Sequence, residues 1–237
     1  MMRRELLGLL SAGVGLLALP GCNAILPKRH TFRFRMTVEV DTPQGLKSGS
    51  SVMELSVALA TFKLPDSAAV DLHFQGEAVP IDLPGGTLFA LVGDRHNVMS
   101  FVGTIIDSFD PSHPRAEELV ELAAELGTQR ALGRTVIMAA DSFPSLVRFR
   151  DIREPRTIEL VDPNEIAKSF GPGVKLKRIF LTIVNEPVTT GIEKRFRWWG
   201  DYYQRSFDGA KFGIMDSTSN DLAAHISIGD FQRGDKK

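Results

Sequence analysis

The chain has 237 residues, a formal net charge of −1, 43% hydrophobic residues and 24% charged residues. These values are typical of a globular protein and exclude a disordered chain or one built mainly of membrane spans. The near-neutral charge offers no general attraction for nucleic acid, so we expect no nucleic-acid partner. The single cysteine, Cys22, excludes an intrachain disulfide and a cysteine-based metal site.

The first 21 residues have the composition of a secretory signal. Arg3 and Arg4 precede an apolar stretch from Leu6 to Leu19, and a small residue, Gly21, stands directly before Cys22. The apolar stretch has about 14 residues, whereas a helix needs about 20 to span a bilayer. We therefore predict that this segment is a signal peptide that is removed on export.

The residues around the predicted cleavage point carry a resemblance. Leu19-Pro20-Gly21-Cys22 resembles the lipobox of bacterial lipoproteins, although Pro20 stands where that family usually has a small or β-branched residue. The resemblance implies a diacylglycerol thioether on Cys22 and an acyl chain such as palmitate on its amine, which together give stable membrane anchoring. Asn23 resembles the outer-membrane class of these lipoproteins. The alternative is a plain signal peptide that contains a cysteine, and the export route, general secretory or twin-arginine, stays open.

Residues 22–30 are predicted to form a lipid-anchored tether, and residues 31–237 a single globular β-rich domain. Alternation of apolar and polar side chains predicts strands, of which the clearest starts at Phe32. The strands that we expect cover residues 32–40, 51–60, 70–75, 78–83, 88–92, 135–140, 146–150, 157–161 and 176–184. The apolar stretch 97–106 fits either type of element.

Two helices are expected. The first follows Ser112 as the N-cap, with Pro114 in the first turn and Gly127 at the end. The second begins at Asp162-Pro163-Asn164-Glu165 and ends at Gly171. Since strands outnumber helices and do not alternate regularly with them, we predict an α+β fold, mainly an antiparallel sheet or sandwich with two helices packed on it. We expect the tail after Phe207 to wrap the surface or to fray.

The sequence contains few patterns that indicate catalysis. It has no Gly-x-Ser-x-Gly elbow, no phosphate-binding loop and no closely spaced histidine pair, so we predict neither a catalytic residue, a metal nor a cofactor. His73 alternates with the apolar face of its strand and is expected to face solvent. Asp94 and His96 follow an apolar strand, where catalytic groups often lie, and they define the alternative hypothesis of an exported hydrolase-like enzyme of an unrecognised family.

Both tryptophans and both tyrosines of the chain fall within six residues of one another, next to arginines. Aromatic faces beside arginine can stack on sugars or dock a partner, which makes this segment a candidate ligand or partner surface. In the other interpretation, which we favour, the rings complete the core. The candidate surface comprises Arg195, Arg197, Trp198, Trp199, Tyr202 and Tyr203.

Two further stretches, Thr189 to Arg195 and Val38 to Ser50, are similar to segments of exported bacterial proteins of unknown function. This resemblance implies an exported family and brings no catalytic residue with it. The hypothesis for function is therefore a membrane-anchored lipoprotein in the cell envelope that binds an envelope protein or polymer without catalysis.

Overall fold

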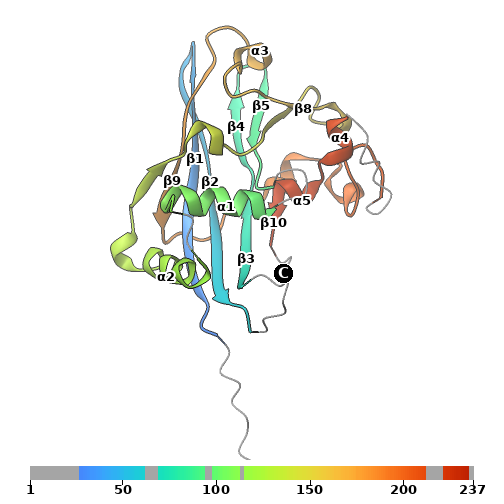
Figure 1. The fold of residues 1–237 in the computed structure, drawn as a ribbon. Helices are drawn as coiled ribbons and strands as arrows, with labels where there is room; N and C mark the ends of the chain where they lie inside the picture. Colours follow the sequence, from blue (N-terminus) through green and yellow to red (C-terminus); the bar gives the residue numbers. More distant parts are fainter. Residues whose placement is uncertain (1–26, 62–68, 94–97, 113–114, 212–220, 235–237) are drawn as a thin grey trace, which may run out of the picture.

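The computed structural model describes residues 27–61, 69–93, 98–112, 115–211 and 221–234. Two antiparallel sheets dominate it, and helices lie beside them (Figure 1). This arrangement confirms the predicted α+β class with mainly antiparallel strands. Within the described ranges no helix has both the length and the apolar character that crossing a bilayer requires.

The larger sheet is built around the long strand β1, whose predicted alternation is confirmed. Phe34 of β1 lies opposite Met53 on one side and Ile183 on the other, and all three side chains are buried. The order of the sheet is β10-β3-β2-β1-β9-β6. Its strands are β1 (His30–Thr42), β2 (Gly45–Leu59), β3 (Val70–Glu77), β6 (Thr135–Ile137), β9 (Lys175–Val184) and β10 (Gln232–Arg233).

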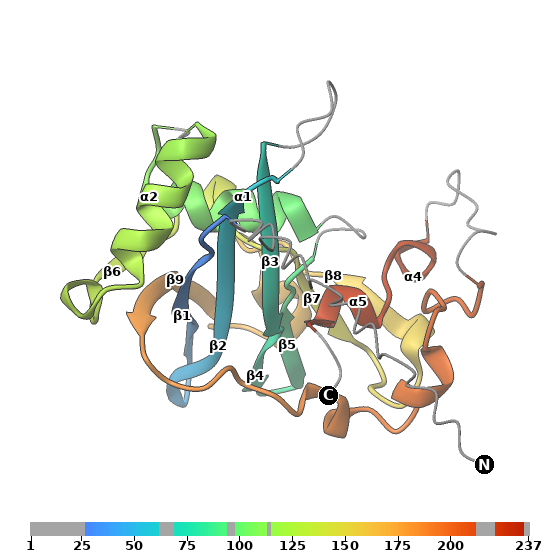
Figure 2. The same cartoon turned by 90° about the horizontal axis from the view of Figure 1, so that it is seen from below.

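Two helices, α1 (Val98–Phe109) and α2 (Ala116–Leu126), cover one face of this sheet (Figure 2). In α1, Phe101, Ile105 and Phe109 recur every four residues and are all buried, which is the spacing of one helix face. The type of α1 was ambiguous in the sequence. The prediction that Ser112 caps α2 was wrong: the helix begins four residues later, where the Arg115 backbone N–H donates to the Glu118 carboxylate at 2.8 Å.

The smaller sheet has the order β4-β5-β7-β8 and continues directly from the larger one, because Ala78 alone separates β3 from β4. Its strands are β4 (Val79–Leu83), β5 (Gly86–Ala90), β7 (Leu146–Phe149) and β8 (Ile158–Leu160). Alternate residues of β5 enter two different cores: Leu88 packs toward the larger sheet, whereas Phe89 packs toward the C-terminal part of the chain. Both faces of this sheet are buried at Leu88 to Ala90 of β5, and there the strand is continuously apolar, as the run at 88–92 predicted.

The two sheets approach each other closely where β2 passes β4. A Cβ atom built on Gly49 would lie 2.1 Å from the Pro80 carbonyl oxygen, which no side chain could tolerate. Glycine is therefore required here because of a backbone contact and not because of a turn. The core between the sheets, which we call the sheet core, also includes the buried sides of α1 and α2.

The predicted second helix is present only as the short α3 (Ala167–Phe170), and it ends at Gly171 as expected. Asp162 lies in a turn that precedes α3, where its carboxylate accepts a hydrogen bond from the Asn164 backbone N–H at 2.8 Å. The described residues contain three more helices that we did not assign: α1, α4 (Leu222–His225) and α5 (Ile228–Phe231).

After β9 the chain crosses the face of the larger sheet opposite α1 and α2 (Figure 2). Thr189 fixes this crossing: its backbone N–H donates to the Val52 carbonyl at 3.0 Å, and its hydroxyl accepts from the Val52 N–H at 2.8 Å. The chain then forms the C-terminal lobe, which comprises residues 191–211 and 221–234. The expectation that the tail wraps the surface or frays was wrong for residues 221–233, because they form α4, α5 and β10 and bury Phe231 completely.

Candidate binding site

The C-terminal lobe packs its aromatic side chains onto the outer face of β5 and β7. It has little regular structure beyond α4 and α5; short 3₁₀ turns cover Ile192–Arg195 and Trp199–Tyr202. Seven rings form what we call the aromatic core, with adjacent ring centroids 4.8 to 6.4 Å apart. These rings are Phe89, Phe149, Phe196, Trp198, Trp199, Phe207 and Phe231.

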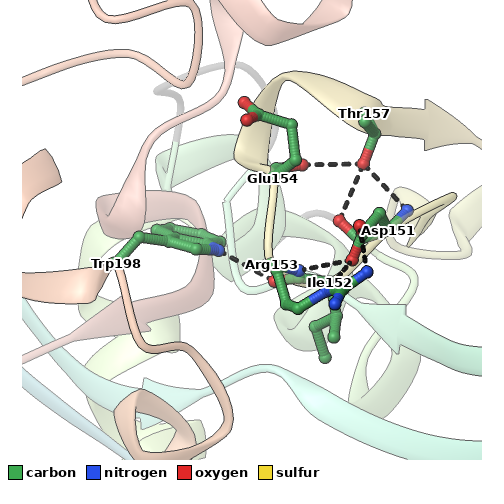
Figure 3. A network of polar contacts seen from close by, with 6 residues as sticks. All are labelled: Asp151, Ile152, Arg153, Glu154, Thr157 and Trp198. Carbon is green, nitrogen blue, oxygen red and sulfur yellow. Dashed lines mark hydrogen bonds and ion pairs between the residues drawn. The ribbon is translucent and has the colours of Figure 1, made fainter.

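Both tryptophans of the predicted surface belong to this core, since each is only 7% exposed. The indole N–H of Trp198 donates to the Ile152 carbonyl oxygen at 2.8 Å, so its one polar group is satisfied within the protein (Figure 3). Their rings therefore act as the support of the segment, and other side chains form its exposed surface.

The Ile152 carbonyl is held by a tight polar turn between β7 and β8 (Figure 3). The Thr157 hydroxyl lies 2.9 Å from the Asp151 carbonyl and 2.7 Å from the Glu154 carbonyl. Arg153 donates to the Asp151 carboxylate from both its backbone and its guanidinium, and the guanidinium hydrogen bonds hold the carboxyl pKa of Asp151 below its ordinary value. The turn thus presents a fixed acceptor to Trp198.

A buried carboxylate ties the lobe to the joint between the sheets. Glu77 is 4% exposed and stands at the end of β3, where its carboxylate accepts from the Ile192 backbone N–H at 2.9 Å. Burial raises the pKa of Glu77 above 4.5, and the backbone N–H groups of Gly191 and Ile192 act in the opposite direction. The bond fixes the point at which the chain enters the lobe.

The remaining predicted surface residues point outward to different degrees. Arg195 donates to both carboxylate oxygens of Asp82, at 2.9 and 3.2 Å, and these bonds lower the pKa of Asp82. Arg197 is exposed. Tyr202 is half-buried, and burial raises its pKa, whereas Tyr203 is 57% exposed.

Tyr203 borders a hollow of about 470 Å³ that is lined by Tyr203, Gln204, Arg205 and Lys211. Of these four described side chains, two are cationic and none is acidic. The Arg205 guanidinium is oriented by a hydrogen bond to the Gly209 carbonyl at 3.0 Å. Gln204 has a φ of 60°, a left-handed conformation that residues other than glycine adopt at a cost, and it turns the chain at the rim.

Three predicted residues lie outside the described residues: Cys22, Asp94 and His96. His73 is exposed on β3, as expected. Nowhere in the described ranges do three or more His, Cys, Asp or Glu side chains come together as a group that could hold a metal ion.

The sequence prediction missed Arg205 and Lys211 because they are isolated cations in a segment without periodicity. It also missed Glu77, whose partner lies 115 residues further along the chain. No local pattern could have indicated either arrangement. The strand predicted at this place covered residues 70–75 and did not include Glu77.

In comparisons with known proteins, no protein-family model matches the sequence, and neither a curated protein nor a solved structure shows significant similarity to the chain.

Proposed function

We propose that this protein is an exported lipoprotein that binds an acidic polymer of the cell envelope without catalysis, through the hollow beside Tyr203. The observation that carries the proposal is the described lining of this hollow, which combines two cations with an exposed aromatic ring. The backbones of Arg205 and Lys211 pair with each other, and the Arg205 guanidinium is held by the Gly209 carbonyl, so the two cations are brought together before a ligand binds.

The polymer chemistry follows from the lining. Arg205 and Lys211 attract carboxylate or phosphate groups, and the bidentate geometry of arginine suits both. The ring of Tyr203 offers a flat apolar face on which a sugar can stack, with a hydroxyl at its edge. Arg197, exposed in the same segment, extends the positive charge along the chain.

The anchor follows from the lipobox-like sequence before Cys22. His30, where β1 begins, lies eight residue steps after Cys22, with seven residues between them. A fully extended chain spans about 3.3–3.6 Å per residue, so this tether reaches at most about 26–29 Å. The domain would then stay close to the membrane surface, where envelope polymers are concentrated.

The anchor is tested by the intact mass of the protein from native membranes, compared with a Cys22→Ser variant. We expect a lipid-modified mass that begins at residue 22 and is lost in the variant. An unmodified mass in the soluble fraction of the unaltered protein would contradict the anchor and leave the binding surface to be judged separately.

Binding is tested with two soluble probes, polygalacturonate as the acidic polymer and dextran as the neutral one. We expect the full chain to bind polygalacturonate with an affinity that falls at high salt, and to bind dextran much more weakly. Lys211→Gln should weaken binding about tenfold, since hydrogen bonds to charged groups contribute about 1.5–3 kcal/mol.

The matched control is Lys175→Gln, which removes an exposed lysine at the start of β9. It should leave the affinity unchanged, whereas Tyr203→Ala should weaken it. Equal binding of both polymers, or equal loss in the Lys175 and Lys211 variants, would overturn the assignment of the hollow.

A further inference from the structure

A second cavity lies where the larger sheet ends beside α1. It shares no lining residue with the Tyr203 hollow. The last strand, β10, pairs with β3 only at Gln232 and Arg233, opposite Glu77 and Gly76. Beyond this short pairing, no described strand covers that edge of β3. A groove of about 360 Å³ opens there between β3, α1 and the segment from Gly229 to Gly234.

One side of the groove is apolar. Leu72 and Phe74 of β3 and Met99 and Val102 of α1 line it. Phe74 is held by an edge-to-face contact with Phe101, with ring centroids 5.5 Å apart, so the wall is rigid there. Met99 is 52% exposed, an unusual position for a large apolar side chain, and its flexible thioether can adapt to an apolar ligand.

The other side carries Arg233, for which the described part of the chain offers no counterion. The guanidinium of Arg233 lies against Gly229, since a Cβ atom built on that glycine would lie 3.5 Å from the Arg233 Cζ. The Nε atom of Arg233 is covered by the protein and has no hydrogen-bond partner among the described residues. Among the described residues, no carboxylate lies within ion-pair distance of Arg233. The terminal nitrogens of the guanidinium are not among such buried atoms, so they are the donors that an anionic ligand in the groove would reach.

We propose that this groove binds a single-chain amphipathic anion, a carboxylate or phosphate head group on an unbranched alkyl chain. The head group would accept hydrogen bonds from Arg233, and the chain would lie against Leu72, Phe74, Met99 and Val102. The volume is near the lower end of the range of about 300–1,000 Å³ that is typical of small-molecule sites, which favours one chain over two. The proposal concerns a site separate from the Tyr203 hollow and does not depend on the polymer.

The experiment titrates the full chain in lipid nanodiscs with octanoate, octyl phosphate and 1-octanol, using empty nanodiscs as the blank. The methyl groups of the methionines are ¹³C-labelled, and the Met99 signal is assigned with a Met99→Leu variant. We expect the Met99 methyl signal to shift and saturate with either anion, and to respond at least about tenfold more weakly to octanol. The tighter of the two anions identifies the head group.

Arg233→Gln should weaken binding of the anion about ten- to hundredfold. Met99→Glu places a negative charge at the exposed rim and should weaken binding of the anions more than binding of octanol. Binding to this variant is followed by the same titration, using the signals of the remaining methionines. Arg130→Gln, which removes an exposed arginine near α2, is the matched control and should bind as the unaltered protein does.

Equal affinity for octanol and the anions, no saturable shift at Met99, or unchanged binding in Arg233→Gln would each overturn the proposal. Because Arg233 is half-buried, the Arg233→Gln variant is first compared with the unaltered chain by urea unfolding. If that variant fails to fold, the Met99→Glu result decides: selective loss of anion binding supports the site, and unchanged binding contradicts it.

Discussion

The two cores of this protein reach similar burial by different means. The sheet core rests on long hydrogen-bonded ladders and is mostly aliphatic: 6 of its 33 buried residues are aromatic. In the aromatic core 7 of 14 buried residues are aromatic, and in the lobe that contributes most of them each helix, 3₁₀ turn and strand has at most four residues. Large rings bury much apolar area per residue, so few residues can order an irregular segment. Long helices and strands are thus not a requirement for a fixed surface.

The largest expected effect tests whether the two cores unfold together. Phe34→Ala in the sheet core and Phe231→Ala in the aromatic core each remove a fully buried ring, and each should cost about 3–5 kcal/mol. Both tryptophans lie in the lobe, so fluorescence reports on the lobe and far-ultraviolet circular dichroism reports on the sheets. We expect the two signals to change at the same urea concentration in both variants, since β10 and Glu77 join the regions. A fluorescence transition that shifts alone in Phe231→Ala would mean that the lobe unfolds independently.

A smaller effect is expected at the link itself. Glu77→Ala should cost about 1–3 kcal/mol, because the buried Ile192 N–H loses its acceptor. Glu77→Gln keeps an acceptor oxygen and removes the charge. Glu77→Ala therefore measures the loss of the hydrogen bond and the charge together, whereas Glu77→Gln measures the loss of the charge alone.

The ionisation of Glu77 also predicts a pH dependence. Burial raises its pKa in the folded state above 4.5, so the folded protein binds this proton more tightly than the unfolded chain does. The contribution of Glu77 to stability is therefore highest below pH 4.5, falls as the pH rises through the folded-state pKa, and is constant above it. Urea unfolding between pH 4 and pH 8 should show this decline in the unaltered protein and a smaller decline in Glu77→Gln. Identical profiles would show that the carboxyl group is not responsible.

The smallest effect is expected on the surface of the lobe. Arg195→Ala breaks the ion pair with Asp82, whose side chain is 68% exposed, and should change the free energy of unfolding by about 0.2–1 kcal/mol. The pair also lowers the pKa of Asp82, so its contribution should be lost as the pH falls below 3.8. A cost comparable to that of Phe231→Ala would mean that the lobe depends on its surface pairs and not on its rings.

The same contrast explains what could be predicted from the sequence. Strand β1 of the larger sheet alternates clearly, because one face is buried and the other carries charged residues such as Arg33 and Arg35. The type of element at α1 was ambiguous because apolar residues occupy most of its sequence. In such a stretch the helical period of 3.6 residues cannot be told from the strand period of two. The sequence left two interpretations of the tryptophans open, a ligand surface or a place in the core. Trp198 and Trp199 are both buried, which agrees with a place in the core. The exposed cations of the lobe and the uncompensated Arg233 depend on contacts between distant segments, which local patterns do not contain.

The position of β1 has a mechanical consequence. This strand lies between β2 and β9 and is antiparallel to both, with 13 paired residues on one side and 9 on the other. The chain before His30 leads directly into it. Tension applied to that end along the strand axis would load both ladders in shear, so that many hydrogen bonds would have to break together and not one after another. A protein pulled from its N-terminus in this way would resist extension far better than one whose first element is an edge strand that peels away.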